Sequence, residues 1–271
     1  MEIIKPKIMG ILNITEDSFS DGGYYLKPEI ALKKAVQLID DGADIVDIGA
    51  ASSNPETRPV PPQVEIDRLN PVIDLLHSNH VPVSIDTFNP VVQKHVIQKG
   101  VQYLNDIQGF PNLEIYPELA DSDCKLIVMH SIQRLGPATV VATKPEQVFA
   151  GIIEFFEERL NALHDAGISS ERIILDPGMG FFLGSNPESS IYVLKNIKGL
   201  KEHFHLPVFV GVSRKSFLGA IVGGRTTLER GPATLAAEIY LSEMGVDYIR
   251  THDVRALGDA LKVMETLKFD Q

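Results

Sequence analysis

A short buried strand that ends on a carboxylate is the chemically richest feature of the sequence. Ile173–Leu175 is an apolar run typical of a buried strand, and Asp176 follows it directly before Pro177 and Gly178, which end strands. A charge in that position is costly to bury without a partner, so Asp176 is a candidate ligand-binding residue. The alternative is a carboxylate held by the backbone amides of its own turn.

Polar side chains also end most of the other apolar runs. They are Asn13, Asp86, Asn105, Asp106, His130, Ser213, Arg214, Lys215, Arg250 and His252. Capping of a core would leave one or two such residues by chance, so their number favours a functional interpretation. For Asp86 an alternative stays open, because it could cap the helix that begins at Asn89-Pro90.

Eight strand-like runs that alternate with eight helical patterns must position these side chains. The predicted strands are Ile8–Asn13, Ile45–Gly49, Val81–Asp86, Tyr103–Asp106, Leu126–His130, Ile173–Asp176, Pro207–Val212 and Tyr248–Thr251. The predicted helices are Glu29–Asp40, Gln63–Ser78, Pro90–Lys99, Leu113–Ala120, Pro145–Ala166, Pro187–Phe204, Thr227–Met244 and Val254–Lys268.

Strict alternation without a break in composition predicts one domain over residues 1–271 with a parallel sheet. Eight repeats and this length favour an α/β fold of the (β/α)8 TIM-barrel type, with a doubly wound open sheet as the alternative. In a barrel, the C-terminal ends of the strands face one mouth, where barrel enzymes carry out their chemistry.

Composition narrows the class of protein. A net charge of -11 argues against nucleic-acid and anionic-membrane partners, although an anionic small molecule could bind where Arg and Lys gather. The single Cys124 excludes an internal disulfide and a multi-cysteine metal site. Without a leader pattern or an apolar run near eighteen residues, we expect a cytoplasmic protein.

Read in order, the motifs resemble the signatures of dihydropteroate synthase. The matching segments are Met9–Gly23, Thr57-Arg58-Pro59, Ser84–Thr87, Asn105-Asp106, Asp176-Pro177-Gly178, Val212–Ser216 and Arg250–Asp253. The resemblance covers essentially the whole chain. It implies a barrel enzyme of folate synthesis that joins 6-hydroxymethyl-7,8-dihydropterin diphosphate to p-aminobenzoate and releases pyrophosphate, with Mg2+. It also implies a homodimer, with which the apolar Leu235, Ile239 and Leu257 are compatible.

The resemblance further implies a role for each matching residue. Catalytic roles fall to Asp86, Lys215, Arg250 and His252, and pterin binding to Asp86, Asn105, Asp176 and Lys215. Diphosphate binding falls to Asn13, Arg250 and His252, with Asn13 also the Mg2+ ligand. The p-aminobenzoate contacts are Phe19, Arg58, Pro59, Phe181, Phe182, Lys215 and Ser216. The implied reaction is dissociative, with diphosphate leaving before the aniline nitrogen attacks.

Two loops depart from the family pattern. The loop after the second strand, Gly49–Pro59, is longer than usual and has lost a glycine. The loop after Asp176 has about two extra residues, one of them aromatic, and resembles the mobile sulfonamide-resistant branch of the family. We hypothesise that Phe182 or its neighbour Phe181 clashes with the bulk that sulfonamides carry beyond the shared aniline. A neutral insertion with a merely packed Phe182 is the alternative.

Two other functions stay open at this point. A pterin-dependent methyltransferase on a related barrel would keep Asp176 and Asn105, but it would not need Lys215 or the pair Arg250 and His252. An inactive pterin-binding subunit would be expected to have lost catalytic side chains, whereas none of the matched positions is lost.

Overall fold

Eight parallel strands form the centre of the molecule. The computed structural model describes residues 5–15, 27–51, 60–134 and 141–268. Within these ranges the strands are β1 (Lys7–Asn13), β2 (Ile45–Gly49), β3 (Val83–Asp86), β4 (Tyr103–Asp106), β5 (Lys125–Met129), β6 (Ile173–Asp176), β7 (Phe209–Val210) and β8 (Tyr248–Thr251).

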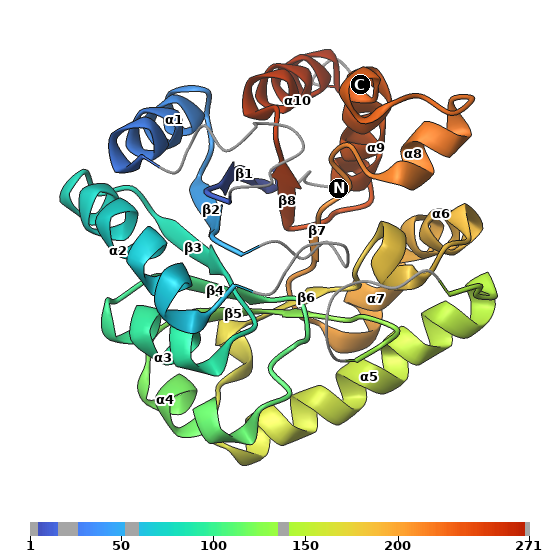
Figure 1. The fold of residues 1–271 in the computed structure, drawn as a ribbon. Coiled ribbons are helices and arrows are strands. Elements are labelled where there is room, and N and C mark those ends of the chain that lie inside the picture. The colour runs from blue at the N-terminus through green and yellow to red at the C-terminus, as the bar shows by residue number, and fades with distance from the viewer. Residues whose placement is uncertain (1–4, 16–26, 52–59, 135–140, 269–271) are drawn as a thin grey trace.

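The sheet curls into a nearly closed barrel, so the predicted barrel is confirmed and the open-sheet alternative is wrong. Neighbouring strands follow the order β6-β5-β4-β3-β2-β1-β8-β7. A parallel bridge between Leu175 and Val208, with the Leu175 amide donating to the Pro207 carbonyl at 2.9 Å, joins the two ends of that order. Figure 1 shows the helices arranged around the strands.

The described helices connect consecutive strands, except α10, which follows the last strand, β8. They are α1 (Pro28–Asp40), α2 (Pro62–Ser78), α3 (Pro90–Gln98), α4 (Tyr116–Asp121), α5 (Pro145–Asp165), α6 (Pro187–Lys195), α7 (Ile197–Phe204), α8 (Ser216–Ile221), α9 (Gly231–Glu243) and α10 (Val254–Lys268). Proline opens several of them, where its fixed φ suits the first turn and its missing N–H costs nothing. Asn89 and Asn186 cap α3 and α6 by accepting the amides of Val91 and Glu188.

Three predicted helices are divided in the structure. The helix expected over Leu113–Ala120 begins as a 3-10 turn, Leu113–Ile115, and α4 starts at Tyr116. The helix expected over Pro187–Phe204 is interrupted at Asn196, whose side chain donates to the Tyr192 carbonyl and whose backbone leaves the helical region. The helix expected over Thr227–Met244 begins as a 3-10 turn, Thr227–Glu229, and α9 starts only at Gly231. The capping box between Thr226 and Glu229 stabilises the separate turn.

The core has two layers, one inside the barrel and one between strands and helices. The inner layer takes one residue from each of seven strands: Met9, Ile45, Tyr103, Ile127, Ile174, Phe209 and Tyr248. The outer layer includes Leu257 of α10, which is fully buried. The expectation that Leu257 contributes to a dimer surface is therefore wrong.

A buried carboxyl group on α9 makes stability depend on pH. Glu238 is 1% exposed, and burial raises its pKa to about 8 despite a hydrogen bond with Thr251. Because the folded pKa lies above the unfolded value of about 4.3, this group costs stability as pH rises between the two. We expect Glu238→Gln to stabilise the fold by on the order of 1–3 kcal/mol more at about pH 8 than at about pH 5. Urea unfolding at both pH values measures this difference, and an equal effect at both would contradict it.

Candidate active site

The inward face of the barrel changes from apolar to charged toward the C-terminal ends of the strands. Residues two apart on a strand share a face. Each polar residue follows an inner-layer residue by two positions: Asp47 follows Ile45, Asn105 follows Tyr103, Asp176 follows Ile174 and Arg250 follows Tyr248. The alternation that builds the apolar layer therefore also places four polar side chains directly above it, in the mouth.

Arg250 lies at the centre of this polar layer. Its Nε donates to Asp47 Oδ2 at 2.6 Å, and its second guanidinium nitrogen donates to Asp86 Oδ2 at 3.1 Å. Burial by itself would lower the pKa of Arg250, but the two carboxylates outweigh burial and raise the pKa. The arginine is thus charged and is held by residues from β2 and β3.

Two carboxylates of the mouth, Asp86 and Asp176, have unusually high pKa values. Burial raises the pKa of Asp86 to about 7, against the lowering effect of Arg250 and together with neighbouring carboxylates. Burial also raises the pKa of Asp176 to about 6, although Lys215 and a turn amide oppose it. Perturbed carboxylates gathered in one cleft are typical of functional sites.

Asp176 both caps its own turn and interacts with nearby cations. The Gly178 amide does donate to Asp176 Oδ1, at 2.8 Å, as a carboxylate capping its own turn requires. However, the cations Lys215 and Arg250 also stabilise this carboxylate. Asp176 therefore belongs to the charged cluster as well as to its turn.

Lys215 reaches the same cluster from the loop before α8. Its Nζ donates to the Met179 carbonyl at 3.1 Å and lies 5.1 Å from the centre of the Phe182 ring. Burial lowers the pKa of Lys215 to about 8, although Asp176 opposes the shift. The ammonium is consequently a stronger acid than that of an exposed lysine, yet it is mostly charged at neutral pH.

His252 lies just past the end of β8 and is neutral. Burial lowers its pKa to about 3, and nearby cations such as Arg214 and Arg250 lower it further. Its Nδ1 is 2.8 Å from the Ser213 hydroxyl, which also accepts the His252 amide at 3.2 Å. A neutral ring that receives the Ser213 proton on Nδ1 carries its own proton on Nε2.

Two asparagines complete the part of the mouth that the structure describes. Asn105 is 4% exposed, and its Oδ1 has no hydrogen-bond partner among the described residues. Asn13 ends β1, where its Oδ1 would lie 3.4 Å from a Cβ added at Gly49, which ends β2. An unpaired buried amide oxygen is expensive, so Asn105 points to a ligand that supplies a donor.

His130 and Asp106, which the sequence placed among the polar strand ends, hold loops in position. The His130 ring contacts the Pro177 carbonyl at 3.1 Å and packs edge-on against Phe155, and burial lowers its pKa to about 4. Asp106 accepts the amides of Gln108 and Phe110. His130 therefore holds the loop after β6, and Asp106 holds the loop after β4.

Gly178 is required by the turn that follows Asp176. Its φ is +71°, and an added Cβ would lie 2.3 Å from the His130 carbonyl oxygen. We expect Gly178→Ala to destabilise the fold by on the order of 2 kcal/mol, because both the backbone and the contact are strained. Thermal unfolding measures the loss, with Gly199→Ala as the control because nothing lies within 4 Å of its added Cβ. Equal effects of the two substitutions would contradict the account.

The two neighbouring phenylalanines differ in position. Phe182 faces Lys215, whereas Phe181 is 48% exposed. Phe181 and Ser216 line a hollow of about 200 Å3 between the loop after β6 and the first residues of α6 and α8. Phe19, Arg58 and Pro59 lie outside the described residues.

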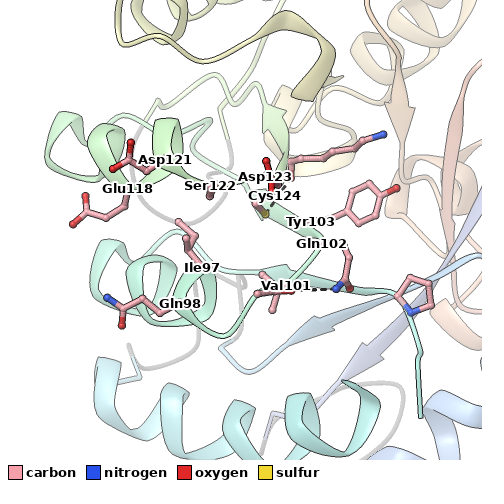
Figure 2. A pocket seen from close by; sticks show the side chains of 13 residues that line it. Ile97, Gln98, Val101, Gln102, Tyr103, Glu118, Asp121, Ser122, Asp123 and Cys124 are labelled. Atoms are coloured by element: carbon pink, nitrogen blue, oxygen red, sulfur yellow. Dashed lines mark hydrogen bonds between the residues drawn. The ribbon is translucent and has the colours of Figure 1, made fainter. Parts of the chain in front are cut away.

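A larger hollow, of about 760 Å3, lies at the opposite end of the barrel. Figure 2 shows that its lining comes from the ends of α3 and α4 and the starts of β4 and β5. It contains none of the residues that the motifs single out. Cys124 lines it, and burial raises the pKa of this thiol to about 12, so the thiol is unreactive. We therefore place the candidate active site at the mouth, where the charged groups converge.

Asp47 is the residue of the mouth that sequence reasoning missed. It precedes the end of its strand by two residues and sits inside the run Ile45–Gly49, so a search restricted to strand ends passes over it. The signal that would have found it is the alternation of Ile45 and Asp47 on one face, since a carboxylate that is fully buried needs a partner.

Comparisons with known proteins show which family the chain resembles. The profile of the family described as pterin binding enzyme matches residues 9–252. The chain is 57% identical over 261 residues to the dihydropteroate synthase type-3 of Escherichia coli, covering 96% of this chain and 99% of that protein. It is 49% identical to the Escherichia coli type-2 protein, covering 96% of each chain.

This chain belongs to the dihydropteroate synthase family. Among solved structures, the Xanthomonas albilineans dihydropteroate synthase with 4-aminobenzoic acid superposes with a TM-score of 0.88 at 32% identity, covering 99% of this chain and 95% of that one. A Burkholderia cenocepacia dihydropteroate synthase complexed with 7,8-dihydropteroate gives 0.84 at 33% identity, covering 97% and 92%. The resemblance inferred from the motifs is confirmed, and so is the prediction of an alkyl-transferring enzyme. Within the described ranges, no helix of this synthase combines the length and apolar character needed to cross a membrane.

Proposed function

We propose that the mouth of the barrel condenses 6-hydroxymethyl-7,8-dihydropterin diphosphate with p-aminobenzoate. The observation that carries the proposal is the charged layer of Asp47, Asp86, Asp176, Lys215 and Arg250 around the unpaired amide oxygen of Asn105. A methyltransferase would need neither Lys215 nor Arg250 there. An inactive subunit would not be expected to retain the whole cluster.

The amino-pyrimidinone edge of the pterin is assigned to Asp176 and Asn105. This edge presents adjacent donors and acceptors, and Asp176 and Asn105 Oδ1 both offer buried acceptor atoms. Lys215 supplies a donor close to Asp176. Buried polar groups reject ligands that leave them unpaired, so this edge should dominate the choice of substrate.

The diphosphate is assigned to Arg250, His252 and Asn13. Arg250 uses one Nε–H and one terminal N–H on carboxylates, so other N–H groups of its fork remain for phosphate oxygens. In the tautomer in which Ser213 donates to Nδ1, the neutral His252 ring supplies one further donor from Nε2. These donors stabilise the charge that develops on the leaving group.

Mg2+ fits this site through Asn13. The described residues contain no cluster of three His, Cys, Asp or Glu that could cage a metal ion. A single amide ligand supplemented by substrate oxygens and water is instead a common way to bind Mg2+. When bound, Mg2+ would neutralise charge on the departing pyrophosphate.

The proposed reaction takes the dissociative order that the family resemblance implies. The bond between the exocyclic carbon and the diphosphate oxygen breaks, and its electron pair leaves with pyrophosphate. Asp86 stabilises the positive charge that remains on the pterin, and Lys215 orients the ring. The aniline nitrogen then bonds to the carbon and releases a proton. Since burial raises the pKa of Asp86 to about 7, the charged form increases as pH rises through neutrality.

We assign p-aminobenzoate to the side of the mouth formed by the loop after β6 and the start of α8. Ser216 and Phe181 line the small hollow there, and their chain neighbours Lys215 and Phe182 contact each other. The remaining contacts assigned to this substrate are Phe19, Arg58 and Pro59.

Phe182 is the better candidate of the two phenylalanines for excluding sulfonamides. It faces Lys215, whereas Phe181 is about half exposed. A ring held beside the reacting centre can clash with a bulky sulfonyl substituent and spare the smaller carboxylate of p-aminobenzoate. The neutral-insertion alternative predicts no effect of Phe182 on the drug.

A homodimer would use the exposed face of α9. This helix carries apolar residues around most of its circumference, and Leu235 and Ile239 are only partly buried. A surface helix with apolar side chains on its outer face suits a subunit contact.

Product analysis tests the proposed reaction. Incubation with both substrates and Mg2+ should yield 7,8-dihydropteroate, identified by mass spectrometry, and omission of either substrate should abolish it. Tight binding of the pterin diphosphate without product would favour the inactive subunit instead. Transfer of a methyl group from a reduced folate would favour the methyltransferase.

A further inference from the structure

The loop after β6 encloses the side chain of Lys215 from several directions. The Met179 carbonyl accepts from Nζ at 3.1 Å, and a Cβ added at Gly180 would lie 3.3 Å from Lys215 Cδ. The Phe182 ring centre lies 5.1 Å from Nζ. The loop therefore contacts both the stem and the head of the lysine.

Contacts of its carbonyl and its Cβ hold the main chain of Phe182 in position. Its carbonyl accepts the Ile132 amide at 3.0 Å, which ties the loop after β6 to the loop after β5. Its Cβ would lie 3.4 Å from a Cβ added at Gly178, so the residue packs closely over that turn. The backbone and Cβ from which the ring extends toward the ammonium are thus held in place.

We propose that Phe182 is a positioning residue for Lys215, whose charged ammonium it holds in the site through the face of its ring. A cation within about 6 Å of an aromatic centroid is attracted by the ring quadrupole, more strongly where water is excluded. The inference deepens the proposed function and rests on it, because it assigns to the extra aromatic of this loop a part in the reaction as well as in drug exclusion.

The electrostatic surroundings make this role measurable. Lys215 interacts with Asp176 of β6, with Asp86 of β3 and with Arg250 of β8, and it affects His252 beyond β8. Burial has already lowered the Lys215 pKa to about 8, so a small change in the stability of the ammonium moves its titration through the working pH range. Loss of the ring removes a contact that favours the charged form, so the pKa must fall further.

Replacement of the ring by an aliphatic side chain of similar size tests the proposal. If the alkaline limb of the kcat profile reflects Lys215, Phe182→Leu should shift that limb to lower pH by about half to one and a half units. Phe182→Tyr, which keeps the ring, should leave it near the wild-type position. Phe181→Leu is the matched control from the adjacent residue, and it should not move the limb, whatever its effect on KM.

A titration without substrate separates this inference from the proposed function. Lysine labelled with 13C at Cε reports the Lys215 pKa by NMR, with Lys215→Arg assigning the signal. A lower pKa in Phe182→Leu and an unchanged pKa in Phe182→Tyr and Phe181→Leu would support the positioning role, even if no protein formed product. An unchanged Lys215 pKa in a folded Phe182→Leu protein would overturn it, even if the enzyme is active. If Phe182→Leu does not fold, Phe182→Met carries the same test.

Discussion

Asp176→Asn should lower kcat/KM for the dihydropterin diphosphate by at least about a thousandfold, because an amide cannot replace both acceptor oxygens of the carboxylate. One carboxylate oxygen already accepts the Gly178 amide at 2.8 Å. An amide nitrogen in place of that oxygen would face the Gly178 donor. An amide nitrogen in place of the other oxygen would leave the pterin donor without an acceptor. The loss should appear mainly in kcat/KM for the pterin substrate. Steady-state kinetics at about pH 8, where wild-type Asp176 is ionised, measure it.

The control and the pH dependence sharpen this prediction. Asp123→Asn, at the opposite end of the barrel, should leave kcat/KM unchanged. In the wild-type protein, pterin affinity should fall as pH drops through about 6, where the buried carboxyl of Asp176 takes up a proton. Asp176→Asn should lack that limb. A loss smaller than about tenfold would contradict the assignment of the pterin edge to Asp176.

Phe182→Ala should lower the inhibition constant for a sulfonamide about ten- to a hundredfold relative to the KM for p-aminobenzoate. Removal of the ring opens the space that the sulfonyl substituent needs, whereas the smaller carboxylate gains nothing from it. The ratio of the two constants is the relevant measurement, because any change in Lys215 affects drug and substrate together. Competitive inhibition assays at one pH give both values.

Phe181→Ala is the matched control for drug exclusion. Its side chain is about half exposed and does not face the Lys215 ammonium, so it should change the ratio far less. A large change with Phe181→Ala and none with Phe182→Ala would assign the drug-excluding wall to Phe181 and contradict the choice of Phe182. No change with either would support the neutral insertion.

The strands and the charged mouth follow largely from local sequence. Strands β3, β4 and β6 are each four residues, mostly apolar before a final Asp, because a buried parallel strand admits few polar residues before its end. The bounds of β2, β4, β6 and β8 match the predicted ranges. Strand β7 is shorter than predicted, since only Phe209 and Val210 join the regular ladder while Val208 makes a single bridge.

Features that depend on tertiary contacts could not be predicted from the sequence. The alternation of Ile45 and Asp47 places Asp47 on the inward face, but its partner Arg250, 203 residues away, is known only from the structure. The choice between Phe181 and Phe182 rests on the turn that aims one ring at Lys215 and the other outward. Helix α8 is too short for its periodicity to be recognised, with six residues between the loop of Lys215 and Val222.

Release of pyrophosphate is the most direct test of the central claim that this mouth performs the condensation. The purified protein should release pyrophosphate from the dihydropterin diphosphate when both p-aminobenzoate and Mg2+ are present, and release should persist in excess sulfonamide. Release that sulfonamide abolishes would support the condensation reaction but contradict the role of Phe182 in drug exclusion. Absence of release under all conditions would contradict the account of the site as a catalytic centre.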